Sequence, residues 1–317
     1  MKQFQAKVKI LLGCSFLCFL GAIFYIRCQN ENKMLVSPFT SAEKILSNWI
    51  KKEKKEKSWR PHTMLDNYHR DQITIEAKSA LAINFTENEV LFAQNANTPY
   101  AIASLTKIMT ACLGLEFASP KTEMLVSENA VQDGEATMDL IAGEKLTMKE
   151  LLYGLFLVSG NDAANVIAEN IGGRENIFVA LMNEKAKILN LKQTKFYNPH
   201  GLDENNIPPN QSTVYELAIL TNHALNHYSE IRQIVKTKEI IFPAEKNHQE
   251  YHLINVLGLE KTYPGMIGVK PGNTESAGYC LIGLIKKNNQ EILTILLDSP
   301  NPKEEVRKLF NYSCSFL

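Results

Sequence analysis

The chain has 317 residues, and its 34 Lys and Arg residues balance 34 Asp and Glu residues to a formal net charge of zero. Hydrophobic residues make up 45% and charged residues 21%, which argues for a packed globular protein and against a disordered chain or a multi-span membrane protein. The neutral balance lacks the basic footprint of a nucleic-acid-binding protein, so no nucleic-acid partner is expected.

An apolar run without any charged residue occupies residues 10–26. A helix of that length spans about 26 Å, close to the minimum for crossing a bilayer core. Lys2, Lys7 and Lys9 precede the run, which favours a cytoplasmic N-terminus and export of the remainder. Because no small-residue cleavage pattern follows, we predict an uncleaved signal-anchor, a transmembrane helix, over residues 1–29.

A charged connector is predicted over residues 30–70. Its residues 51–57 read KKEKKEK, a run typical of a solvated helical stalk rather than of a specific binding patch. After this connector the sequence becomes a series of apolar segments separated by polar turns. Residues 71–317 are therefore predicted to form the catalytic domain.

The elements of that domain follow from hydrophobic periodicity. Residues 77–85 and 90–95 flank a polar turn and predict a β-hairpin. Helices are predicted over residues 104–117, 146–158, 162–170, 175–189, 213–225 and 302–310. Strands are predicted over residues 265–272, 276–287 and 291–299. Strands at both ends with helices between them predict a mixed α/β fold of the α+β type, an antiparallel sheet flanked by helices plus an all-helical region.

The first chemical signal is Ser104-Leu105-Thr106-Lys107. On a helix, positions i and i+3 share a face, so the Ser104 hydroxyl and the Lys107 amine can meet. A serine needs an adjacent base to become a nucleophile, and a desolvated lysine can serve as that base. By itself the tetrapeptide is more typical of a helix start, with a capping serine and a solvated lysine, than of a catalytic pair.

Two further short motifs follow in the chain. Ser159-Gly160-Asn161 lies between two predicted helices, where it can line a cleft or simply cap the second helix. Lys270-Pro271-Gly272 lies on a predicted strand, where a cation and a glycine at a sheet edge can hold an extended peptide and its carboxylate. The alternative is a surface lysine before a turn.

The ordered set S-x-x-K, S-x-N and K-x-G is a motif set of penicillin-binding proteins and class A β-lactamases. Five longer segments extend the match: residues 99–110, 159–165, 198–203, 212–218 and 263–281. On these residues the chain resembles the low-molecular-mass penicillin-binding proteins, which are serine D-alanyl-D-alanine carboxypeptidases of the peptidase S11 family. The resemblance covers about residues 70–317 and implies a β-lactamase/transpeptidase-like fold.

The resemblance also implies the roles of residues in a D-Ala-D-Ala carboxypeptidase. Ser104 would be the nucleophile that forms an acyl-enzyme, Lys107 the general base and Ser159 the proton relay. The substrate-binding residues would be Asn161, Lys270, Gly272, Asn273 and Thr274, with the backbone N–H groups of Ser104 and Asn273 holding the oxyanion. No metal or cofactor is expected. Expected partners are peptidoglycan stem peptides as substrate, β-lactams as covalent inhibitors, and the bacterial cytoplasmic membrane, with the catalytic domain on its periplasmic or extracytoplasmic side.

Pro271 departs from the family's usual K-T-G. A missing threonine hydroxyl removes one charge-assisted hydrogen bond to the substrate carboxylate, about 1.5–3 kcal/mol. Two alternatives therefore remain open: a DD-endopeptidase of the same family, and a catalytically weakened wall-binding protein. A class A β-lactamase is disfavoured, because no Glu-x-x-x-Asn follows Ser159–Asn161.

Two histidine pairs have the i, i+4 spacing of metal ligands. They are His223 with His227, and His248 with His252. Without an acidic third ligand in a recognisable pattern, we interpret them as exposed helix or loop histidines. His200 is interpreted as a structural turn residue beside the cleft.

Overall fold

The structure, a computed structural model, describes residues 59–62, 67–68, 73–132 and 135–317. The predicted membrane anchor over residues 1–29 and most of the predicted connector lie outside these ranges. Within them, every helix is too short or too polar to cross a bilayer.

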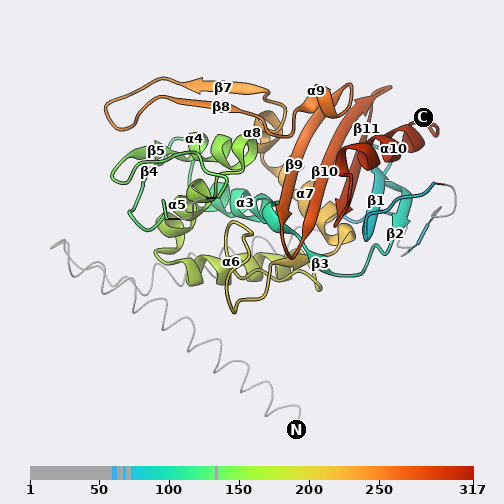
Figure 1. Ribbon diagram of the computed structural model, residues 1–317, viewed down its shortest axis with the longest axis horizontal. Helices are drawn as coiled ribbons and strands as arrows, with labels where there is room; N and C mark the ends of the chain where they lie inside the picture. The colour runs from blue at the N-terminus through green and yellow to red at the C-terminus, as the bar shows by residue number, and fades with distance from the viewer. Residues whose placement is uncertain (1–58, 63–66, 69–72, 133–134) are drawn as a thin grey trace, which may run out of the picture. The chain divides into compact units, whose positions relative to one another are not determined.

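One five-stranded antiparallel sheet organises the domain, in the order β2-β1-β11-β10-β9 (Figure 1). Its strands are β1 (Ser79–Asn84), β2 (Glu89–Gln94), β9 (Met266–Thr274), β10 (Gly278–Lys287) and β11 (Gln290–Leu297). The hairpin of β1 and β2 and the three C-terminal strands are thus confirmed as predicted. The Asn84 side chain shapes the hairpin turn by accepting hydrogen bonds from the N–H groups of Thr86 and Glu87 at 3.1 and 3.2 Å. Strand β9 forms the edge of the sheet nearest the helical region.

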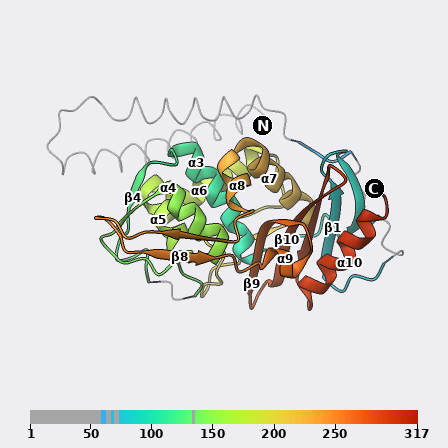
Figure 2. The ribbon, with the colours of Figure 1, turned by 90° about the horizontal axis from the view of Figure 1, so that it is seen from above.

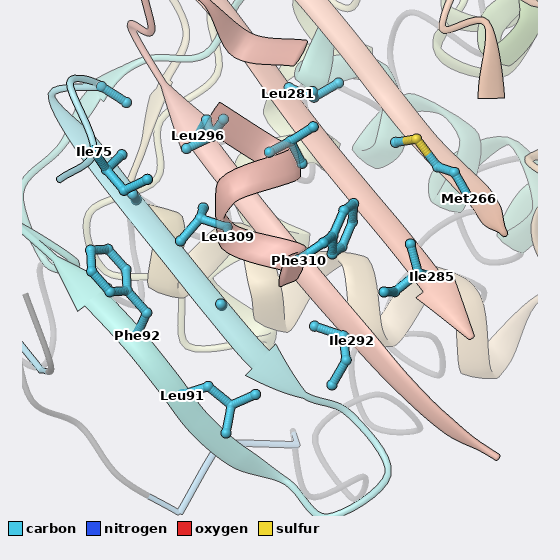
Figure 3. Packing of buried hydrophobic residues seen from close by; sticks show 14 of the residues in the cluster. Ile75, Leu91, Phe92, Met266, Leu281, Ile285, Ile292, Leu296, Leu309 and Phe310 are labelled. Carbon is cyan, nitrogen blue, oxygen red and sulfur yellow. The ribbon is translucent and has the colours of Figure 1, made fainter. Parts of the chain in front are cut away.

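Helices cover both faces of the sheet (Figures 1 and 2). Helix α10 (Pro302–Cys314) lies on one face, and helix α7 (Val214–His227) lies against the other. Alternate residues of β11, Ile292 and Leu296, pack with Leu309 and Phe310 of α10 in a buried cluster (Figure 3). This period of two gives the sheet two apolar faces, as a strand buried on both sides requires.

The helical region lies beside the sheet. It contains α3 (Lys107–Phe117), α4 (Met148–Tyr153), the π-helical turn η3 (Gly154–Val158), α5 (Asn161–Gly172), α6 (Glu175–Ile188) and α8 (Ser229–Ile234). A capping box fixes the start of α4, because Thr147 accepts from the Glu150 N–H while the Glu150 carboxylate accepts from the Thr147 N–H. The predicted helices are confirmed, although residues 146 and 147 belong to a strand rather than to the helix predicted over residues 146–158.

Several short elements were not predicted. They are β3 (Tyr100–Ala101), η2 (Ala103–Thr106), β4 (Glu123–Leu125), β5 (Lys145–Thr147), β6 (Gln211–Ser212), β7 (Glu239–Phe242), β8 (Tyr251–Ile254) and α9 (Leu259–Thr262). Two to four residues are too few to show a hydrophobic period. The β7–β8 hairpin nevertheless borders the cleft, since the Val256 N–H that follows it donates to the Leu157 carbonyl at 2.9 Å.

Part of the predicted connector contacts the domain. Tyr68 and Ala93 of β2 exchange two backbone hydrogen bonds of 2.9 Å. The Arg60 guanidinium donates to the Leu189 carbonyl at 2.6 Å. These contacts tie residues assigned to the connector to both the sheet and the helical region.

Candidate active site

Ser104 lies in η2, where the chain passes from β3 into α3. The preceding residue, Ala103, has a φ of +45°, a left-handed conformation that is strained for alanine. The Ile102 N–H donates to the Asn210 carbonyl at 3.0 Å, which fixes this turn from β6's side. Ser104 therefore lies in an irregular turn that a backbone hydrogen bond holds in place. The sequence had instead predicted one uninterrupted helix over residues 104–117.

Lys107 is fully buried and touches Ser104 directly. Its Nζ lies 2.9 Å from Ser104 Oγ, 2.7 Å from Asn161 Oδ1 and 2.7 Å from the His200 carbonyl oxygen. The amide and backbone oxygens can only accept hydrogen bonds. A neutral Lys107 amine would give its two N–H groups to them and keep its lone pair for the Ser104 hydroxyl.

The two oxygens that hold Lys107 are themselves fixed. Asn161 begins α5, and its Nδ2 donates to the Glu135 carbonyl at 2.8 Å. The His200 turn is closed by the Leu202 N–H, which donates to His200 Nδ1 at 3.1 Å, and this confirms His200 as a turn residue. At Gly201, with a φ of +90°, a Cβ would lie 2.0 Å from the Ala103 carbonyl oxygen. Only glycine lets this turn reach Lys107.

Ser159 lies at the end of η3 in a left-handed conformation, with a φ of +63°. It lines a cavity of about 770 Å³ together with Ser104, Gly272 and Asn273. The structure thus brings the S-x-x-K, S-x-N and K-x-G motifs to one cleft, although they come from three distant stretches of the chain. Gly160, not Ser159 or Asn161, occupies the N-cap position of α5, so neither side chain caps that helix.

Lys270 is a fully buried residue of the edge strand β9, so it is not the surface lysine of the alternative interpretation. Burial lowers the pKa of Lys270 to about 7. Its Nζ donates to the Pro271 carbonyl at 3.0 Å. A lysine poised between its charged and neutral forms near neutral pH is typical of functional sites.

Thr274 and Asn273 differ in their surroundings. Asn273 lines the cavity. The Thr274 hydroxyl donates to Asp203 Oδ1 at 3.2 Å and accepts from the Ala277 N–H at 3.2 Å. These contacts stabilise the β9–β10 turn against the loop that carries Gly201, so Thr274 already has two protein partners.

The histidine pairs correct one interpretation. His223 and His248 are buried, not exposed, because α7 and the β7–β8 hairpin pack them against Glu116 and Glu150 respectively. Burial lowers the pKa of His223, which keeps that imidazole neutral at pH 7. No group of three or more His, Cys, Asp or Glu side chains suited to a metal ion occurs in the described part of the chain.

A five-stranded antiparallel sheet with helices on both faces and a Ser-Lys pair beside its edge strand is the architecture of the DD-peptidases. The crystal structure of the Streptomyces K15 DD-transpeptidase matches it with a TM-score of 0.70 at 29% identity, over 77% of this chain and 98% of that one. A family model described as D-alanyl-D-alanine carboxypeptidase, peptidase S11, matches residues 66–301. The chain therefore belongs to the peptidase S11 family, and the resemblance seen in the sequence is confirmed.

Individual relatives agree with this assignment. D-alanyl-D-alanine carboxypeptidase DacF of Bacillus subtilis is 37% identical over 258 residues, which are 79% of this chain and 65% of DacF. The D-alanyl-D-alanine carboxypeptidase of Streptomyces sp. strain K15 is 30% identical over 75% of this chain and 87% of its own length. The chain spans less than two thirds of the length of DacF and of DacD from Salmonella typhimurium.

Proposed function

We propose that the protein is a serine-type D-Ala-D-Ala carboxypeptidase that acts on peptidoglycan stem peptides and is acylated by β-lactams. The observation that carries the proposal is the 2.9 Å contact between Lys107 Nζ and Ser104 Oγ, while Asn161 Oδ1 and the His200 carbonyl oxygen, which cannot donate, hold the same amine at 2.7 Å. This is the geometry in which a nucleophile meets its general base.

The proposed reaction has two steps. Ser104 Oγ attacks the carbonyl carbon between the two D-Ala residues while Lys107 takes the hydroxyl proton. The C–N bond then breaks, and the departing D-Ala amine receives that proton through the Ser159 hydroxyl. Water next attacks the Ser104 ester, giving its proton to Lys107, and the acid product leaves as Ser104 recovers its proton. The N–H groups of Ser104 and Asn273 would hold the negative oxygen in both steps.

The carboxylate end of the substrate is assigned to Lys270. This residue lies on β9 one position before Pro271, and Gly272 brings the strand against Ser104. A charged Lys270 would attract the terminal carboxylate. An extended peptide at the free edge of β9 would add to the sheet as a sixth strand.

The test measures acylation and D-Ala release together. Purified full-length protein should gain one benzylpenicillin mass on Ser104 and release D-Ala from an N-acylated pentapeptide ending in D-Ala-D-Ala. Ser104→Ala should lose both, whereas Ser119→Ala, a change of the same type at an exposed site, should keep both. If the folded wild-type protein is not acylated and releases no D-Ala, a wall-binding role is favoured. Cleavage confined to cross-linked dimers would favour an endopeptidase.

We further propose the placement predicted from the sequence: an anchor over residues 1–29 in the bacterial cytoplasmic membrane, a stalk after it, and a catalytic domain on the extracytoplasmic side. The apolar run over residues 10–26 supports this placement. Full-length protein should stay with membranes after alkaline carbonate extraction, and its catalytic domain should be open to protease in spheroplasts. Release by carbonate would argue against the anchor.

A further inference from the structure

The cavity that contains Ser104 does not end at the catalytic cleft. Its wall also includes Tyr279 and Leu281 of β10 and Arg307 of α10. Leu281 belongs to the cluster that packs beneath α10 (Figure 3). The cavity therefore reaches residues on both faces of the sheet.

Strand register shows how this is possible. Gly272 faces Ser104, because a Cβ on Gly272 would lie 2.9 Å from the Ser104 backbone nitrogen. Successive residues of a strand point to opposite faces. Pro271 therefore faces away from Ser104, on the same side as its partner Leu281. Since β9 is the sheet edge, the cavity passes around it, and Pro271 forms part of the floor on the α10 side.

The far part of the cavity is apolar with a cationic rim. Pro271, Tyr279, Leu281, Val256 and Leu257 contribute apolar groups to its lining. Lys303 and Arg307, at i and i+4 of α10, contribute two cations. Glu304 also lines the cavity, and its carboxylate pairs with Lys308 at 3.5 Å, which offsets its charge.

A peptide bound along β9 would extend from the catalytic cleft beside Ser104 into the far part of the cavity. If Lys270 holds the terminal carboxylate, the chain runs along β9 toward Asn273, three residues or roughly 10 Å away. Asn273 pairs with Tyr279, so the next atoms of the substrate reach the far part of the cavity. The terminal dipeptide alone cannot fill a space of about 770 Å³.

We infer that this far part binds the acyl portion of the substrate that precedes the scissile D-Ala-D-Ala bond, and that Lys303 favours a carboxylate there. The inference rests on the proposed function, because the ligand must be attached at Ser104. Tyr279 and Pro271 supply the apolar contact, and Lys303 supplies the charge. An acidic stem peptide has the chemistry to use both.

Two penicillins that differ by one carboxylate provide the test. Benzylpenicillin and α-carboxybenzylpenicillin share every other group of the acyl side chain. The measurement is the second-order rate constant for acylation of Ser104 by each compound, and the ratio of the carboxylated to the plain compound. Lys303→Glu should lower that ratio by about fivefold, a typical size for reversing one rim charge. The effect should weaken at high salt.

Lys287→Glu is the matched control, since it makes the same charge change at the exposed β10–β11 turn. It should leave the ratio as in the wild type. Tyr279→Ala should slow acylation by both penicillins and leave the ratio unchanged. An unchanged ratio in Lys303→Glu, or an equal change in Lys287→Glu, would overturn the inference. Failure of both penicillins to acylate the wild-type protein would instead overturn the proposed function.

Discussion

Gly272 and Ser104 lie so close that no side chain fits between them. A Cβ on Gly272 would be 2.9 Å from the Ser104 backbone nitrogen and 3.4 Å from that of Leu105. Both neighbours are backbone atoms, which cannot rotate away as a flexible side chain can. The glycine of the K-x-G motif therefore sets the separation between the edge strand and the serine.

Gly272→Ala should consequently push β9 away from η2 without unfolding the protein. We expect acylation of Ser104 by benzylpenicillin to slow by about 100-fold, the cost of a misplacement on the order of 1 Å. Stopped-flow or mass spectrometry measures this rate. Gly265→Ala is the control for general destabilisation, because its φ of +78° strains an alanine while a Cβ there meets nothing closer than 3.9 Å. Equal losses in both variants would contradict the predicted role of Gly272.

Asn161→Ala should weaken the support of Lys107. The change removes the Oδ1 that accepts from Lys107 Nζ at 2.7 Å and the Nδ2 that donates to the Glu135 carbonyl. A buried donor left without its partner costs about 1–3 kcal/mol, so acylation should slow by roughly 10- to 100-fold.

A second asparagine on α5 separates this effect from general destabilisation. Asn170 also bridges its helix to strand β4, through contacts of 3.1 and 2.9 Å with the Leu125 N–H and carbonyl. Asn170→Ala should lower the unfolding temperature and leave the acylation rate intact. A comparable acylation loss in Asn170→Ala would show that α5 stability, not the Lys107 contact, is responsible.

The pKa of Lys270 predicts a pH dependence of catalysis. Burial lowers it to about 7, so the ammonium that would attract the substrate carboxylate is lost as the pH rises through 7. kcat/KM for a D-Ala-D-Ala peptide should therefore fall on the alkaline side of about pH 7. In Lys270→Arg, whose guanidinium stays charged, this fall should disappear. The same alkaline fall in both proteins would assign it to another group.

The same pKa predicts how stability depends on pH. The unfolded chain keeps the Lys270 proton up to its ordinary pKa of 10.5, whereas the folded protein releases it near pH 7. Between these values the unfolded state binds more protons, so this residue makes the free energy of unfolding rise with pH. Urea titrations at pH 7 and pH 10 should show a smaller rise for Lys270→Met. An identical rise in both proteins would indicate a different titrating group.

Glu116 forms a buried charge cluster away from the cleft, with Lys185 of α6 and the Tyr228 hydroxyl. Burial alone would raise the pKa of Glu116, but His223, Lys185 and Tyr228 together lower it to about 2. The contribution of this carboxylate to the free energy of unfolding is fully present above its ordinary pKa of 4.5. It is lost as the pH falls toward the folded-state pKa of about 2.

Glu116→Gln should therefore lower the free energy of unfolding by about 3–5 kcal/mol at pH 7, because it removes the negative charge that pairs with the buried Lys185 ammonium. The destabilisation should shrink toward pH 2. Glu184→Gln breaks the exposed pair with Lys187 and should cost about 1 kcal/mol or less. Similar losses in the two variants would contradict the buried-pair argument.

The sequence anticipated the parts of the site that depend on residue type and spacing. Ser104 and Lys107 are one helical turn apart, and that spacing predicted their contact. The third partner of Lys107, the His200 carbonyl, could not be predicted, because a backbone oxygen has no residue-specific signal. Burial of His223 also escaped prediction, since its charged neighbours Glu116 and Lys185 come from two other helices.

Long elements were predictable for a similar reason. Strand β10 has ten residues and α6 has fourteen, enough for a hydrophobic period to appear. The two-residue strand β3 forms only because β6 pairs with it, through Tyr100 opposite Ser212. Such an element is defined by a partner far along the chain.

The pairing of β1 with β11 places Ser79 opposite Leu297, near the two ends of the domain's sequence. During synthesis the β1–β2 hairpin therefore emerges early and presents an unsatisfied backbone edge until nearly the whole domain has been made. A chain that stops before β11 would keep an unpaired, aggregation-prone strand edge and would not form a smaller folded domain. The β1–β11 pairing can therefore form only after nearly the whole domain has been made, and a holding chaperone would be most useful before that point.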